Sequence, residues 1–179
     1  MRRSGILVIL ALYTGLLTQT EANSEFESDL ATVAALGDLT NAPIMWTDDT
    51  DMAATGTVSA GEMKAIYFDA LDYTGAPTRV YAYVGIPAGA SAGSPVPGAV
   101  LVHGGGGTAY ADWVTEWTNR GYAAISIAVE GQTDERVDGK WVKHAMAGPS
   151  RGALYNDSPD SLTDQWMYHA VADAALANS

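Results

Sequence analysis

Four consecutive glycines follow a histidine at the end of an apolar run. Of all the sequence features of this chain, this one most strongly indicates a chemical role. Residues 98–102 are followed by His103 and then by glycines 104–107. Glycines adopt backbone conformations and allow close approaches that a Cβ atom would forbid, so their N–H groups can converge on one negative charge. Ligands of open α/β sheets bind at the carboxyl ends of strands. We therefore expect an anion-binding loop built from His103, Gly104, Gly105 and Gly106.

Three interpretations of this loop remain open. In an oxyanion hole, loop N–H groups stabilise the tetrahedral intermediate of acyl transfer. Alternatively, Gly104, Gly106 and Ala109 match the pattern G-x-G-x-x-A of a dinucleotide-binding loop, and Glu130 stands where a ribose-binding acid would lie. A glycine turn without a ligand is the third. We favour the oxyanion hole, because strands that look antiparallel precede the loop and a dinucleotide-binding loop usually follows the first strand.

A second motif, G-x-S-x-G, places Ser150 as a formal candidate nucleophile in residues 148–152. A nucleophile elbow requires a strand directly before the serine and a helix directly after it. Here Pro149 precedes the serine within a polar stretch, and only one strand is expected between the glycine loop and Ser150. We interpret Ser150 as a loop residue.

The three histidines do not form a catalytic or metal-binding set in the sequence. We expect His103 to be hydrogen-bonded and to orient the glycine loop, His144 to line the mouth of a pocket, and His169 to lie at the edge of the core. No spacing of His, Asp or Glu matches a zinc site. The acidic residues 48–51 do not match a calcium-binding EF-hand loop, so we expect neither a metal nor a cofactor.

The elements that must position the loop are predicted from hydrophobic periodicity. Residues 63–70 and 78–87 are predicted strands joined by a turn at 74–77, and the second strand alternates between two faces. Residues 98–102 are predicted to be a strand buried on both faces. A helix follows, ended by Gly121, and residues 122–129 form a parallel strand, which completes a βαβ unit. The apolar face of that helix is expected to carry Tyr110, Trp113, Val114 and Trp117.

The flanking segments are less patterned. Residues 25–36 are predicted to form a short helix, and residues 130–158 a polar loop. Serine and proline at 158–159 are suited to the N-cap and first position of a final helix, so we expect this helix to begin there.

The first 22 residues have the pattern of a secretory signal peptide. Arg2 and Arg3 precede an apolar run of residues 5–17, and Thr20 and Ala22 form a small-x-small cleavage site. The run is shorter than the roughly 20 residues of a membrane span. We therefore expect export to the periplasm or outside the cell, with cleavage near Ala22 and no stable membrane anchor.

Composition restricts the partners of this 179-residue chain. Its formal net charge is −12, with 9 basic and 21 acidic residues, and it contains no cysteine. An acidic surface repels phosphate backbones, so nucleic acid is not expected as a partner. The absence of cysteine excludes disulfides, thiolate metal sites and cysteine nucleophiles.

The stretch from residue 96 to residue 179 resembles the α/β-hydrolase superfamily, and specifically the exported esterases and peptidases of the acetyl xylan esterase, dienelactone hydrolase and prolyl-oligopeptidase type. The resemblance is carried by VPGAVLVHGGGG (96–107), the helix with Trp113 and Trp117, RGYAAISIAVEGQ (120–132) and DSLTDQWMYHAVADAALANS (160–179). It covers only the first half of the family's domain. In such families the elbow serine, the acid and the catalytic histidine come later than residue 179.

The resemblance therefore implies a limited set of roles for this chain. The residues 103–106 correspond to the oxyanion loop, whereas Glu130 and His144 are weaker expectations for the wall of the substrate pocket. The fold class that follows is α/β, the N-terminal half of an α/β-hydrolase sheet, with an antiparallel hairpin and then a βαβ unit. The last strand before the missing half is expected to have an unpaired edge.

We expect three regions: a signal peptide at 1–22, an N-terminal extension at 23–60 and a truncated hydrolase domain at 61–179. The expected function is that of an exported serine hydrolase, a carboxyl or acetyl esterase acting on a small-molecule or polysaccharide ester, of which this segment alone is inactive. The alternatives are a prolyl-oligopeptidase-like serine peptidase, a nicotinamide-dependent oxidoreductase and a binding protein without catalytic activity.

Overall fold

The computed structural model describes residues 21–51, 53–152 and 156–179. Its contacts divide the chain into two units, Met1–Asp38 and Leu39–Ser179. In the first unit, residues 21–34 form an α-helix and η1 (Ala35–Asp38) a 3-10 turn, which confirms the helix predicted over residues 25–36. The predicted signal peptide lies outside the described residues, apart from its last two. No helix in the described ranges is long and apolar enough to cross a membrane.

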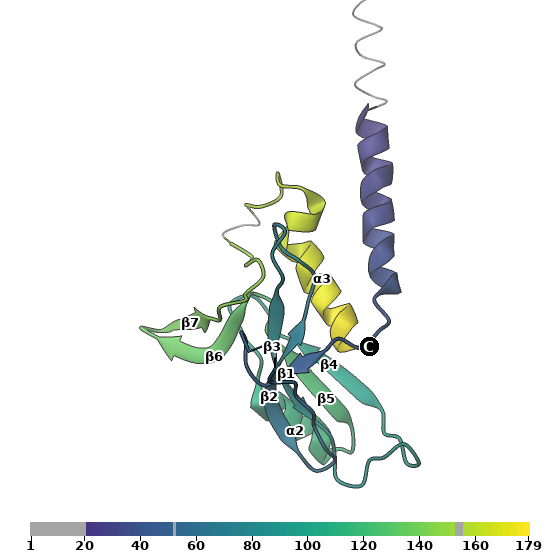
Figure 1. The fold of residues 1–179 in the computed structure, drawn as a ribbon, viewed down its shortest axis with the longest axis vertical. Coiled ribbons are helices and arrows are strands. Elements are labelled where there is room, and N and C mark those ends of the chain that lie inside the picture. The colour runs from purple at the N-terminus through teal and green to yellow at the C-terminus, as the bar shows by residue number, and fades with distance from the viewer. Residues whose placement is uncertain (1–20, 52, 153–155) are drawn as a thin grey trace, which may run out of the picture. The chain divides into compact units, whose positions relative to one another are not determined.

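The second unit is built on one five-stranded mixed sheet (Figure 1) with the order β1-β2-β3-β5-β4. The three pairs β1/β2, β2/β3 and β3/β5 are antiparallel, whereas β4 and β5 are parallel. The strands are β1 (Met45–Trp46), β2 (Met63–Asp69), β3 (Arg79–Gly85), β4 (Gly98–Val102) and β5 (Ala123–Ile127). The antiparallel hairpin and the parallel βαβ unit are therefore confirmed. This mixed α/β arrangement is compatible with part of an α/β-hydrolase-like fold.

Alternation along the strands gives the sheet two different faces. One face is apolar, and its core includes Phe68 and Ile127 together with Trp166 and Leu176 of helix α3 (Trp166–Ala177). The other face carries Tyr67, Tyr81 and Tyr83 and is packed by helix α2 (Ala111–Asn119), which connects β4 to β5. The predicted alternation along β3 is confirmed, although this central strand is buried on both faces.

Strand β4 differs from its prediction, because it lies at the edge of the sheet and is only half-buried. Its one neighbour within the described residues is β5, and Val102 is 45% exposed. The continuous apolar sequence led us to expect burial on both faces. An edge position accounts for the difference, because an edge strand has a neighbour on one side only.

Two further elements depart from the sequence-based expectation. The predicted polar loop contains a hairpin of β6 (Gln132–Val137) and β7 (Lys140–Lys143), which projects from the side of the sheet (Figure 1). Helix α3 begins at Trp166 and not at residues 158–159, which lie in a turn before η2 (Leu162–Asp164).

Tertiary contacts explain the late start of α3. The carboxylate of Asp157 accepts the backbone N–H of Trp166 at 2.6 Å, and this caps the first turn. The indole of Trp166 donates to the carbonyl of Val129 at 2.6 Å. The first bond ties the start of α3 to the preceding turn, and the second ties it to the segment after β5, so tertiary contacts determine where the helix starts.

The close packing of α2 on β3 depends on Gly85. A Cβ atom at Gly85 would lie 2.7 Å from Val114 Cγ1 and 3.0 Å from Thr118 Cγ2. We predict that Gly85→Ala lowers the free energy of unfolding by about 1–3 kcal/mol, the usual cost of overpacking. Chemical denaturation measures this change. Gly98→Ala on β4 is the matched control, because nothing lies within 4 Å of its Cβ position; equal destabilisation by both substitutions would contradict the packing argument.

Candidate active site: the glycine loop and its cleft

His103 connects the ends of the two parallel strands. Its Nε2 atom accepts the backbone N–H of Val129 at 3.1 Å, directly after β5. An amide N–H can only donate, so Nε2 carries no proton and Nδ1 does. Nδ1 lies 2.6 Å from the carbonyl oxygen of Gly104 and donates to it. The imidazole is therefore a neutral bridge from the end of β5 to the loop, in agreement with the orienting role expected for His103.

Three carbonyl groups of the glycine loop accept hydrogen bonds from other groups of the protein. Gly104 O accepts a second bond from the N–H of Gly107 at 3.0 Å, which closes a tight turn. Gln132 Nε2 donates to Gly107 O at 2.5 Å. Trp141 Nε1, on β7, donates to Gly106 O at 2.8 Å. Because the carbonyl oxygens are engaged with the protein, the orientation of the peptide groups is fixed before a ligand arrives, which is the condition for electrostatic preorganisation.

Two of the glycines are required by geometry. Gly106 has a φ of +77°, in the left-handed region that favours glycine. A Cβ atom at Gly107 would lie 2.7 Å from His103 Cβ and 2.8 Å from its Nδ1 atom, so the histidine ring occupies the space that a side chain would need. At Gly104, by contrast, nothing lies within 4 Å of the position that a Cβ atom would occupy.

Two N–H groups of the loop, those of Gly105 and Gly106, differ in their partners. The N–H of Gly106 donates to a carboxylate oxygen of Glu130 at 3.2 Å, so an anionic group already lies on the loop. Within the described residues, no acceptor is paired with the N–H of Gly105. The guanidinium of Arg151 lies against the Cα atom of Gly105. One loop N–H thus contacts an anion, and a second, on the exposed residue Gly105, has no acceptor among the described residues.

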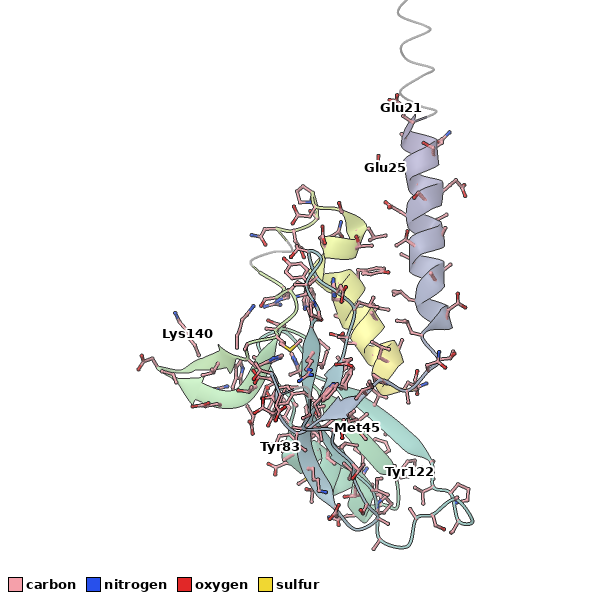
Figure 2. The ribbon with its side chains drawn as sticks, in the orientation of Figure 1. Glu21, Glu25, Met45, Tyr83, Tyr122 and Lys140 are labelled. Carbon is pink, nitrogen blue, oxygen red and sulfur yellow. The ribbon has the colours of Figure 1, made fainter. Side chains whose placement is uncertain are left out.

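A cleft of about 330 Å³ opens beside the loop. Gly106, Glu130 and Ser150 lie on one part of its wall, and Arg136, Lys140 and Trp141 of the β6–β7 hairpin on another. Lys140, labelled in Figure 2, lies on this projecting hairpin. Tyr81 and Tyr83 of β3 both donate their hydroxyl protons to Asp134 of β6, the former at 2.8 Å. These two bonds fix the hairpin to the sheet and therefore shape the cleft.

Ser150 lies in the cleft but lacks the surroundings of a nucleophile. Its hydroxyl donates to the carbonyl of Glu130 at 2.9 Å, and a carbonyl cannot act as a general base. Among the described residues the segment around it is irregular, since residues 148–152 lie in neither a strand nor a helix. The structure therefore brings Ser150 next to the glycine loop without an elbow, as its interpretation as a loop residue predicts.

His144 and His169 are both buried outside the wall of this cleft. The ring of His144 packs edge-on against Tyr67 at 5.1 Å, and burial lowers the pKa of His144 to about 4. His169 Nε2 lies 2.8 Å from the carbonyl oxygen of Thr163, to which it can donate, and burial lowers its pKa as well. Neither ring is placed to accept a proton from Ser150.

The acidic side chains at residues 48–51 accept hydrogen bonds from backbone N–H groups. Asp48 accepts the N–H groups of Thr50 at 2.8 Å and Asp51 at 2.9 Å, and these bonds lower its pKa. Asp49 accepts the N–H of Ala145 at 2.7 Å, which ties this loop to the segment after β7. Across the described ranges, no group of three His, Cys, Asp or Glu residues is arranged to hold a metal ion.

Sequence reasoning missed the residues that support the loop from the hairpin, Gln132 and Trp141, and the neighbouring Arg151. One signal for the hairpin was present, because Asp-Gly is the preferred pair for a two-residue hairpin turn. Asp138 and Gly139 have φ values of 50° and 76°. The charged strands on either side lack the apolar alternation that would have supported this signal.

The chain has little similarity to known proteins. No known family model matches the chain, and no curated protein sequence is similar to it. The solved structure of an acetyl xylan esterase from Paenibacillus sp. R4 is a weak neighbour, with a TM-score of 0.42 and 20% identity. The alignment covers 68% of this chain and 35% of that chain, so the chain spans about a third of the neighbour's length.

The contact between Gly107 and His103 gives a test of the loop. We predict that Gly107→Ala displaces the His103 ring and lowers the free energy of unfolding by about 1–3 kcal/mol, as overpacking does. Gly104→Ala should change it little, because its Cβ position is open. Urea denaturation of the two variants compares these effects, and a larger loss in Gly104→Ala would contradict the prediction.

Asp173 on α3 gives a pH-dependent prediction. Burial raises its pKa to about 8 from an ordinary 3.8, so the folded chain holds a proton that the unfolded chain releases between these two values. Stability is therefore lost as the pH rises through this window. Asp173→Asn cannot ionise, so the variant should gain up to a few kcal/mol over the wild type from pH 4 to pH 8. Thermal unfolding across this range measures the difference, and a pH-independent difference would refute it.

Proposed function

We propose that this chain is the N-terminal part of an exported serine hydrolase, a carboxyl or acetyl esterase, and that residues 103–106 supply oxyanion-hole donors. The observation that carries this proposal is the Gly105 N–H, which has no acceptor among the described residues, beside a Gly106 N–H that already contacts the carboxylate of Glu130. The locked His103 ring supports it further, since donors that do not reorganise stabilise a developing oxyanion best. The loop also follows a strand of a parallel pair, at its carboxyl end.

The nucleophile in this proposal is supplied from beyond Ser179. One edge of β4 has no partner among the described residues, which supports this, because a further parallel strand there would end beside the glycine loop. A serine on an elbow after that strand would attack the acyl carbonyl, while the loop N–H groups receive the oxyanion. The proposed substrate is an ester of a small molecule or a polysaccharide, in line with the esterase resemblance of the sequence. A prolyl-oligopeptidase-like peptidase would use the same loop and differ in the substrate.

Dinucleotide binding is less well supported by this geometry. In that function the N–H groups at the loop would bind a pyrophosphate, and the acid after the next strand would bind ribose away from it. Glu130 instead contacts the N–H of Gly106 directly. A carboxylate at this position would repel a pyrophosphate, which carries more charge than the single oxyanion of an acyl intermediate.

The esterase proposal is tested with a fluorophosphonate probe and p-nitrophenyl acetate. We expect the 179-residue chain to remain unlabelled and to hydrolyse the ester at the same background rate as its Ser150→Ala variant. The product of the same reading frame continued past Ser179 should be labelled on a serine within a G-x-S-x-G sequence. Labelling of Ser150, or a continued chain without a reactive serine, would overturn the proposal.

A further inference from the structure

The cleft beside the glycine loop is locally basic in an acidic protein. The chain has nine Lys and Arg residues, of which four lie between residues 136 and 151: Arg136, Lys140, Lys143 and Arg151. The first three of these line the cleft against a single carboxylate, that of Glu130. The hairpin also carries Asp134, Glu135 and Asp138, but none of them lines the cleft. The wall therefore has an excess of positive charge, while the whole chain has a formal charge of −12.

Among the described residues, these cations form no salt bridge with the protein. Elsewhere, Lys64 pairs with Glu62 at 2.9 Å and Arg120 pairs with Glu116 at 2.5 Å. Among the described residues, none of the four cations near the cleft has a carboxylate oxygen within 4.0 Å. With 21 acidic residues in the chain, unpaired cations gathered around one cleft indicate that the negative charge comes from a ligand.

The arrangement of the cations restricts the kind of anion. The guanidinium of Arg136 lies 3.7 Å from the centre of the Trp141 ring and is stacked on it. Lys140 and Lys143 are both exposed and act as point charges without the planar fork of arginine. They suit an isolated anionic group. A dense polyanion is disfavoured, since the acidic remainder of the chain would repel it.

We infer that the cleft binds an acidic saccharide, whose uronate carboxylate lies at the cationic wall formed by Arg136, Lys140 and Lys143. The saccharide part of this inference rests on the proposed esterase function, whereas the requirement for an anion rests on the charges alone. A volume of about 330 Å³ lies at the lower end of small-molecule sites, which span roughly 300–1,000 Å³. It admits a sugar unit beside Gly106, so the ester and the carboxylate belong to neighbouring positions of one substrate. The lysines bind the carboxylate and take no part in acyl transfer.

Isothermal titration calorimetry of the whole 179-residue chain tests this inference without requiring hydrolysis. The probes are a xylo-oligosaccharide carrying one glucuronate and an unsubstituted xylo-oligosaccharide of the same length. We expect the acidic probe to bind about tenfold more tightly at low salt, because its carboxylate adds exposed charge pairs with the cationic wall. The preference should decrease as the ionic strength rises.

Substitutions at the two lysines connect the preference to the cleft. Lys140→Gln combined with Lys143→Gln should abolish the preference for the acidic probe, with binding of the neutral probe unchanged. Lys64→Gln combined with Arg120→Gln is the matched control, because it removes two charges from residues outside the cleft wall. Both lysines of the cleft are exposed, and circular dichroism verifies that the variants remain folded. Equal affinity of the wild type for both probes, or a preference that survives in the double variant, would overturn the inference.

The two proposals fail in different ways. If the continued chain hydrolyses esters but the wild type shows no preference for the acidic probe, the esterase function stands and the acidic substrate is wrong. If the lysine-dependent preference is found but the continued chain has no reactive serine, the esterase function is wrong and the cleft is a binding site for acidic saccharides.

Discussion

The bridge made by His103 is the interaction on which the rest of the candidate site depends. Its unprotonated Nε2 atom accepts a backbone N–H after β5, and its Nδ1–H donates to the loop that follows β4. The two strands are parallel neighbours, so their carboxyl ends lie at one edge of the sheet. A single neutral ring therefore joins both ends. The same ring leaves no space for a side chain at residue 107, which explains the last glycine of the loop.

Support for the loop comes from segments far away in the sequence. Gln132 and Trp141 belong to a hairpin that follows the βαβ unit, and they hold two of the loop carbonyls. That hairpin is itself fixed to the central strand by tyrosine hydroxyls bound to Asp134. Burial and these hydrogen bonds raise the pKa of Tyr81, so this tyrosine stays protonated and donates. The position of the glycine loop is thus connected, bond by bond, to the middle of the sheet.

The charge distribution separates the surface of the cleft from the rest of the molecule. Several acidic side chains outside the cleft accept hydrogen bonds from the protein, as at Asp48, whose carboxylate accepts backbone N–H groups of its own turn. Basic side chains concentrate on the hairpin and on the segment after it. The loop N–H groups and the lysines of the cleft would act together on a substrate with two features, an ester at the loop and a negative charge beside it.

The sequence by itself determined the elements whose cause is local. The period-two pattern of residues 78–87, the turn before it and the apolar helix face after the glycines predicted the antiparallel hairpin and the βαβ unit, because alternation and helical spacing reflect a nearby apolar core. The hydrogen bonding of His103 to the loop was predicted from its position directly before the glycines. Only the tertiary structure decided that β4 is an edge strand, that α3 begins at Trp166, and that Trp141 and Ser150 lie beside the glycines. Those outcomes depend on neighbours distant in the chain, and periodicity carries no information about such neighbours.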